Sequence, residues 1–431
     1  MPHPRAFLTS QTPQWFLAFV LLLVLVACKS PEERVLLKAQ RLARADRSSE
    51  ALQLLHNYLE RSPQAVEPRR LKILMAIRAQ RSEEVLSDYG AVSDSERRDD
   101  PALLHELALG LIHDALWSEE GLIRARAAAA LAELADLSAR PLLQRGLEHP
   151  DPSVRAHAVE TVGRLGNSAF QRDLEQLLRD PDPFVRAAAA WGIGQLGQPS
   201  SQHLLRQTLL DRHAHVKVRG AGALLMLGDR SVLPLLTRAL EAKDAAVRIQ
   251  AAEVLGHLLE PAARTPLERR LQDTDLYVRL YAAEALAKIG DQEAVSFLRA
   301  ALSNENRFLG LFAGELLSNL GDRSAVPFLK AALKGDADVP MRLYAAWTLA
   351  RFGDRDGLQS AGEVLRHPDP QLRANAAWTL GEIGGDGAMS LLKAVLRDEA
   401  ATVKMHAIWA LDRIVRSRGK TPTVSGPTKM S

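Results

Sequence analysis

The side chains with the most chemical character in this 431-residue chain recur at one regular spacing. Three carboxylates and then three indoles follow one another at intervals of 31 or 32 residues: Glu253, Glu284, Glu315, Trp347, Trp378 and Trp409. Trp191 stands earlier in the same series, and Tyr281, Phe312 and Tyr344 each stand three residues before a member of it. Carboxylates pair with Lys and Arg, and exposed aromatic rings supply much of the binding energy at protein interfaces. These residue types at this spacing favour a binding surface.

Catalytic patterns are absent from the sequence. There is no Gly-rich phosphate loop, no G-x-S-x-G and no H-E-x-x-H. His213 and His215 could be two metal ligands, but the sequence places no third ligand near them. We therefore expect a protein that is not an enzyme and that holds no metal and no cofactor.

The amino-acid composition excludes several classes of protein. Apolar residues make up 47% of the chain and aromatic residues 5%, so a large core of Ala, Leu and Val is expected. The net charge of +3 argues against a nucleic-acid partner, whose binding domain is usually strongly basic. A single cysteine, Cys28, excludes a disulfide within the chain and any metal site built from several cysteines.

A repeated phrase explains the regular spacing. Segments such as VRAAAAWGIGQLG (185–197) and VRLYAAEALAKIG (278–290) recur from about residue 101 onward. Their anchor position falls at Arg124, Arg155, Arg186, Lys217, Arg248, Arg279, Gly310, Arg342, Arg373 and Lys404. Ten copies at nearly constant spacing identify a repeat architecture, in which each copy is one structural unit.

Each copy predicts two helices. The second begins near the anchor, and Ala, Leu, Ile and Gly at the third, fourth, seventh, tenth and eleventh positions after it fall on one helix face. An Asp four residues before the anchor, as in Asp151-Pro152, is a strong helix start. A Gly eleven residues after the anchor, as in Gly166, suits the left-handed residue that ends a helix.

This pattern resembles the HEAT family, and within it the short HEAT-like repeats first associated with phycobilisome lyases. The resemblance covers residues 101–416 and implies an all-α fold, an α-solenoid of about ten helix pairs whose second helices line a concave groove. HEAT-like deoxyhypusine hydroxylases bind iron through repeated His-Glu pairs. Here the pair His105-Glu106 occurs once and outside the repeated position, so that activity is not supported.

The anchor arginines have a structural and a functional interpretation. A row of Arg could bind phosphates, but this position lies only about 20–30° from the centre of the buried face. We therefore expect these arginines to pair with the Asp column at the helix starts and with carbonyls of adjacent repeats.

The predicted groove also leaves two interpretations open. Its acidic middle would meet Lys or Arg of a partner, and its aromatic C-terminal third would hold apolar or proline-rich residues. Alternatively, the indoles pack against each other across neighbouring repeats.

The N-terminal sequence has features of a targeting segment. Residues 15–27 (WFLAFVLLLVLVA) are uncharged but shorter than the ~20 residues of a bilayer-spanning helix, which indicates a signal peptide over residues 1–27. Leu25-Val26-Ala27-Cys28 resembles the lipobox of bacterial lipoproteins, which implies lipidation of Cys28. Lys29 stands where an Asp would favour the inner membrane, so the resemblance implies the outer membrane where the organism has one.

The remaining segments are a lipidated N-terminus with helices over 28–100 and a tail over 417–431. The segment 39–63 resembles a tetratricopeptide repeat, and a second helical pair is expected over 66–89. The tail is rich in Gly, Pro, Ser and Thr and is expected to be disordered.

Together these features predict a lipid-anchored scaffold of the bacterial cell envelope that binds segments of other envelope proteins in its groove. A lyase-like or enzyme-accessory protein that binds a small molecule, and a glycan or peptidoglycan binder, remain the alternatives.

Overall fold

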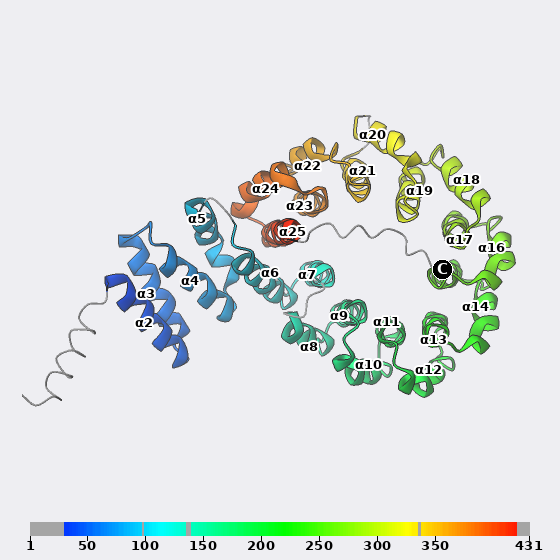
Figure 1. Cartoon of the computed structure of the whole chain (residues 1–431), viewed down its shortest axis with the longest axis horizontal. Coiled ribbons are helices and arrows are strands. Elements are labelled where there is room, and N and C mark those ends of the chain that lie inside the picture. Colours follow the sequence, from blue (N-terminus) through cyan, green and yellow to red (C-terminus); the bar gives the residue numbers. More distant parts are fainter. Residues whose placement is uncertain (1–29, 97–98, 135–138, 335–337, 420–431) are drawn as a thin grey trace, which may run out of the picture. The chain divides into compact units, whose positions relative to one another are not determined.

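The protein is all-α, as predicted. The computed structural model describes residues 30–96, 99–134, 139–334 and 338–419, and every regular element in these ranges is a helix. The lipobox, Cys28 and most of the predicted tail lie outside the described residues. The chain divides into two compact units between residues 98 and 99 (Figure 1).

The N-terminal unit contains α2 (Pro31–Arg44), α3 (Ser48–Arg61), α4 (Val66–Arg78), the 3-10 turn η1 (Ser82–Val85) and α5 (Leu86–Glu96). Neighbouring helices pack around buried residues such as Leu55, Ile73 and Tyr89. The turns after α2 and α4 match each other at a spacing of 34 residues, because Asp46 and Gln80 both have positive φ (58° and 57°). This unit is therefore two similar helix pairs in succession.

The second unit is a stack of ten helix pairs over its described residues. The first helices of the pairs are α6 (Pro101–Leu116), α8 (Arg140–Leu147), α10 (Gln171–Leu177), α12 (Gln202–Thr208), α14 (Leu233–Ala239), α16 (Arg264–Arg270), α18 (Gln292–Ala301), α20 (Val326–Lys334), α22 (Leu358–Val364) and α24 (Gly385–Ala394). The second helices are α7 (Gly121–Leu134), α9 (Pro152–Leu165), α11 (Pro183–Leu196), α13 (Ala214–Met226), α15 (Ala245–His257), α17 (Leu276–Lys288), α19 (Arg307–Asn319), α21 (Val339–Arg351), α23 (Pro370–Ile383) and α25 (Ala401–Gly419). The predicted α-solenoid of about ten pairs is confirmed.

The helix starts and ends follow the local chemistry of the sequence. The predicted aspartates cap the second helices by accepting hydrogen bonds from backbone N–H groups: Asp151, Asp182, Asp244, Asp275, Asp338 and Asp369. The predicted glycines all have positive φ: Gly166, Gly197, Gly228, Gly290, Gly321, Gly353 and Gly384. Left-handed backbone without a Cβ ends each helix and turns the chain toward the next pair.

Buried ion pairs join consecutive repeats, but with a partner that differs from the predicted one. Arg155, Arg186, Arg248 and Arg373 each donate two hydrogen bonds to a carboxylate 25 residues later: Asp180, Asp211, Asp273 and Asp398. These aspartates stand two residues before the capping position, which in two of the four cases is an aspartate that already binds helix N–H groups, Asp182 or Asp275. Arg124, in contrast, pairs with a capping residue, Asp151.

The carbonyl partners also differ from the expectation. The Nη1 of each of these arginines donates to carbonyls five and six residues earlier, in the loop of its own repeat, as Arg248 does to Ala242 and Lys243. Each arginine therefore ties its own loop to the loop of the following repeat. The prediction of carbonyl partners in adjacent repeats was wrong, because the guanidinium reaches back over its own helix start.

The stack of the second unit closes on itself. The last helix, α25, packs against α6 and α7 as well as against α23. At this closure His105 Nδ1 lies 2.9 Å from the carboxylate of Asp412, which is fully buried. The second helices line the inner side of this closed stack (Figure 1), so the predicted groove is an enclosed inner face.

Candidate functional site

Most of the predicted groove residues are partly accessible on the inner face, and two are buried. Trp191, Glu253, Tyr281, Phe312, Glu315, Tyr344, Trp347 and Trp378 are half-buried. Glu284 is 4% exposed and Trp409 is 1% exposed, so the prediction that these two side chains line the groove is corrected. The binding role of the other eight stays a prediction.

Trp409 is buried because its repeat neighbour covers it. Its ring stacks on Trp378 with centroids 4.0 Å apart and planes 10° apart. Gly381 allows this approach, since a Cβ there would lie 2.9 Å from the Trp409 ring. Between these two repeats the indoles pack on each other, which was one of the two open interpretations.

The acidic middle of the inner face is neutralised within the chain. Glu284 forms an ion pair with Lys288 (2.9 Å) and accepts a hydrogen bond from Asn319 (2.8 Å). Glu315 accepts a hydrogen bond from the Tyr344 hydroxyl and lies 3.6 Å from Arg351. These internal partners leave little free negative charge for a partner's Lys or Arg at the predicted place.

Glu253, the remaining member of the acidic series, lies in a poorly solvated environment. Burial raises its pKa, although the nearby guanidinium of Arg219, 3.9 Å away, opposes this shift. Burial also lowers the pKa of Arg219. The negative charge of Glu253 and the positive charge of Arg219 therefore compensate each other.

Six aromatic side chains on three consecutive second helices form what we call the aromatic cluster: Tyr277, Tyr281, Phe308, Phe312, Tyr344 and Trp347. The rings of Phe308 and Tyr344 are stacked at 5.8 Å, and Tyr344 is stacked on Trp347 at 5.8 Å. Phe312 contacts both Tyr277 (5.5 Å) and Tyr281 (5.4 Å). The cluster thus consists of two groups of three contacting rings, and α19 contributes one ring to each group.

The outer members of the aromatic cluster were not predicted from the sequence. Tyr277 is 37% exposed and Phe308 is 43% exposed. Both stand two residues before an anchor, and the recurrence of an aromatic residue at this position in consecutive repeats is the signal that could have found them. These rings extend the aromatic surface from the inner face to the starts of α17 and α19.

Two tyrosines of the cluster, Tyr281 and Tyr344, remain protonated hydrogen-bond donors. Burial raises the pKa of Tyr281 to about 12, and burial together with the hydrogen bond to Glu315 raises the pKa of Tyr344 further. The cluster therefore offers apolar ring surface and neutral hydroxyl groups.

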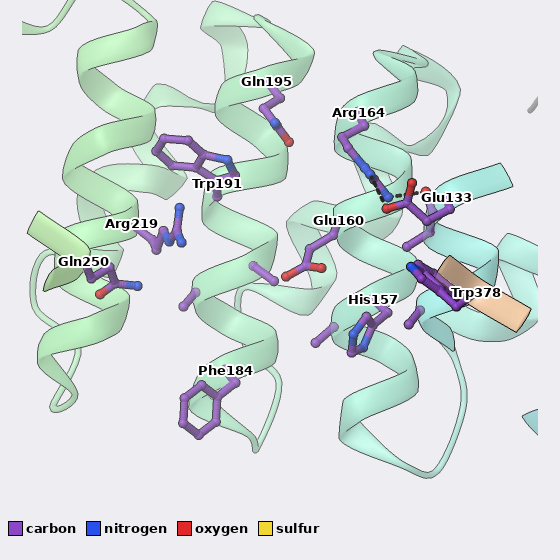
Figure 2. Close-up of a pocket in the computed structure, with 15 residues that line it drawn as sticks. Glu133, His157, Glu160, Arg164, Phe184, Trp191, Gln195, Arg219, Gln250 and Trp378 are labelled. Carbon is purple, nitrogen blue, oxygen red and sulfur yellow. Dashed lines mark hydrogen bonds and ion pairs between the residues drawn. The ribbon is translucent and has the colours of Figure 1, made fainter. Parts of the chain in front are cut away.

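A pocket of about 530 Å³ lies elsewhere on the inner face, and we call it the Trp191 pocket. Figure 2 shows Trp191, Glu160, His157, Phe184 and Trp378 around it. Helices α7, α9, α11, α13, α15 and α23 supply the lining residues. Phe184 is 67% exposed. The pocket combines indole rings with charged and amide side chains.

The charged side chains of the Trp191 pocket differ in the partners that they contact. The guanidinium of Arg219 lies over the Trp191 ring, 4.7 Å from its centroid. Arg164 lies 3.6 Å from Glu133. Glu160 is exposed in the pocket and has no hydrogen-bond or ion-pair partner among the residues that the structure describes.

The candidate metal ligands have other partners. His215 Nδ1 lies 3.0 Å from Gln250, while His213 Nδ1 lies 3.1 Å from Arg186 and 3.3 Å from Asp211. No group of three or more His, Cys, Asp or Glu side chains suited to a metal occurs within the described ranges. In the same ranges, no helix has the length and apolar character needed to cross a membrane.

Comparison with known families gives one extensive match. A model described as HEAT repeats matches residues 110–176, 204–279, 266–340 and 326–412, and a model described as HEAT repeat matches residues 172–199. These matches cover more than half of the chain. A search of the curated proteins found no match.

Several solved structures are similar to the chain at low identity. Human deoxyhypusine hydroxylase in complex with glycerol has 18% identity and a TM-score of 0.30, over 66% of this chain and 98% of that chain. The complex of CpcE and CpcF of phycocyanin lyase from Nostoc sp. PCC7120 has 20% identity and a TM-score of 0.34, over 59% of this chain and 88% of that chain. At these values the likenesses carry no information on activity.

Proposed function

This chain belongs to the HEAT-repeat family, and we propose that it is a protein-interaction scaffold of the bacterial cell envelope. The proposal assigns no reaction to the chain. The aromatic cluster is the observation that carries it, because neighbouring and partly exposed aromatic rings are typical of interface hot spots. In this proposal, an apolar or proline-rich segment of another protein docks on Tyr277 and Phe308 and extends toward Trp347.

The cluster replaces the predicted acidic middle as the main contact. The carboxylates near it already have internal partners, and Arg351 lies over the Trp347 ring, 5.0 Å from its centroid. A partner would therefore gain chiefly from burying ring surface, which contributes about 25 cal/mol per Å² of apolar area.

Quantitative affinity purification from membranes tests this role. The double variant Tyr277→Ala and Phe308→Ala removes two exposed rings and should reduce recovery of the bound partners at least about tenfold, since hot-spot truncations typically cost ~2 kcal/mol or more. The matched control is Leu210→Ala, which removes an apolar side chain that is 86% exposed outside the cluster. Equal recovery from the cluster variant and the control, with unchanged helical content, would refute the proposal.

We also propose that Cys28 anchors the protein to a membrane, at the outer membrane where the organism has one. The support is the lipobox-like sequence 25–28 after an apolar run too short to span a bilayer. The variant Cys28→Ser should lose incorporation of labelled palmitate and move to the soluble fraction. Retention of the label in this variant would exclude Cys28 as the lipidated residue.

The N-terminal unit is proposed to consist of two tetratricopeptide-like repeats. The two left-handed turns at Asp46 and Gln80 recur at 34 residues, which is the period of that repeat. Each turn is followed by the same ion pair, Arg47–Glu50 and Arg81–Glu84. This unit would add a second surface for protein partners.

A further inference from the structure

We propose that the Trp191 pocket binds a single basic side chain, Lys or Arg, of a partner protein, with Glu160 as its counter-charge. This inference rests on the proposed scaffold function and specifies what the scaffold recognises at a second place. The residues of this pocket lie on α7, α9, α11, α13, α15 and α23, whereas the aromatic cluster lies on α17, α19 and α21.

The pocket has the size of a binding site for a small group. Its volume of about 530 Å³ falls within the ~300–1,000 Å³ of typical ligand pockets. It is open enough for a side chain to enter from solvent, as the exposure of Phe184 and Glu160 indicates. One long side chain together with part of its backbone fits this space.

The charged side chains of the pocket indicate the charge of the ligand. Arg164 is occupied by Glu133 (3.6 Å) and also donates to the carbonyl of Ala132. The guanidinium of Arg219 lies over the Trp191 ring and also contacts the carboxylate of Glu253. Glu160 forms no hydrogen bond or ion pair in the described part of the chain, and Arg219, which acts on it only through longer-range electrostatics, is held by Trp191 and Glu253. The pocket is therefore complementary to one positive charge placed beside Glu160.

The aromatic rings around Glu160 favour the same ligand. Figure 2 shows Glu160 with Trp191 on one side and Trp378 on the other. Indole faces attract Lys and Arg by cation–π interaction, and Arg219 over Trp191 shows that the pocket already uses this contact once. A neutral or anionic ligand would cover Glu160 without pairing it, which is costly for a carboxylate removed from water.

Two tripeptides that differ in one side chain, positively charged in one and neutral in the other, test the proposal on the full chain. The probes are N-acetyl-Gly-Arg-Gly-amide and the same peptide with citrulline, a neutral analogue of arginine, titrated by saturation-transfer NMR. The wild type should bind the arginine peptide about tenfold more tightly, because hydrogen bonds to charged groups are the stronger ones. Glu160→Gln should abolish this preference, while the control Glu268→Gln, at an exposed position on α16, should keep it.

Three results with the peptides would overturn the inference: equal affinity of the wild type for both peptides, no detectable binding of either, or a preference that survives Glu160→Gln. A neutral chitotriose that binds equally well to wild type and Glu160→Gln would assign the pocket to glycans and would also overturn it. These results are separate from the scaffold test, because that test changes Tyr277 and Phe308 and measures recovery of partners from membranes.

Discussion

The buried arginine of each repeat allows a direct test of what joins the repeats. Arg248 donates two hydrogen bonds to Asp273, at 2.9 and 2.7 Å, and two to the carbonyls of Ala242 and Lys243, at 2.8 and 3.0 Å. Its side chain is 10% exposed and that of Asp273 is 4% exposed. The variant Arg248→Met keeps an unbranched apolar stem in place of the aliphatic part of the side chain and removes all four hydrogen bonds.

The magnitude follows from what is left unpaired. Removing one partner of a buried ion pair typically costs about 3–5 kcal/mol, because the remaining charge stays buried without its partner. Arg270 lies 3.3 Å from Asp273 and compensates part of that charge. We therefore expect Arg248→Met to lower the free energy of unfolding by about 3 kcal/mol, at the low end of this range.

The next repeat supplies the matched control. Arg279 occupies the same position, but Asn304 stands where Asp273 stands for Arg248, and the Arg279 side chain makes no hydrogen bond within the described residues. Arg279→Met should therefore change the free energy of unfolding by less than about 0.5 kcal/mol. Urea unfolding followed by far-UV circular dichroism measures both variants. Similar losses of stability in the two variants would refute the assignment of these arginines as links between repeats.

Three further predictions concern burial, close packing and closure. Burial lowers the pKa of His406 to about 4, so the folded state resists protonation and stability should fall as the pH decreases from about 6.5 to 4; His406→Gln should flatten this decline in urea titrations. Gly256→Ala should cost about 1–3 kcal/mol in thermal unfolding, because the new Cβ would lie 2.7 Å from the Cα of Ala285. Asp412→Ala removes the partner of His105, so amide exchange should speed up first in α6 and α25; faster exchange elsewhere first would contradict this role.

The local features of the fold were predictable because short segments determine them. A capping Asp needs only the backbone N–H groups two or three residues later, and Gly166 needs only its own left-handed backbone. The anchor arginine was harder. Its burial was predictable from the helix face, but its acceptor at Asp180 lies in the next loop, and the spacing of 25 residues is not a helical period.

The candidate site was only partly predictable for the same reason. The sequence placed Trp191 and Trp378 on the inner side of their helices, and both line the pocket. It left open whether neighbouring indoles pack on each other, as Trp409 and Trp378 do, and it did not indicate that Glu315 would be bound by the Tyr344 hydroxyl. Those contacts depend on how far one repeat is rotated against the next, which no single repeat encodes.

By itself, the sequence determined the repeat, its helix boundaries, its buried faces and the side of the stack that carries the aromatic and acidic residues. These properties depend on hydrogen bonds and apolar periodicity within about one repeat. Only the tertiary structure decided which of those residues remain accessible. Closure of the stack brings together His105 and Asp412, which are 307 residues apart. This contact forms because each repeat is rotated slightly against the one before it, and the rotations add up along the stack. The packing between repeats, and not any pattern within one repeat, leaves Glu160 exposed in a pocket and buries Trp409.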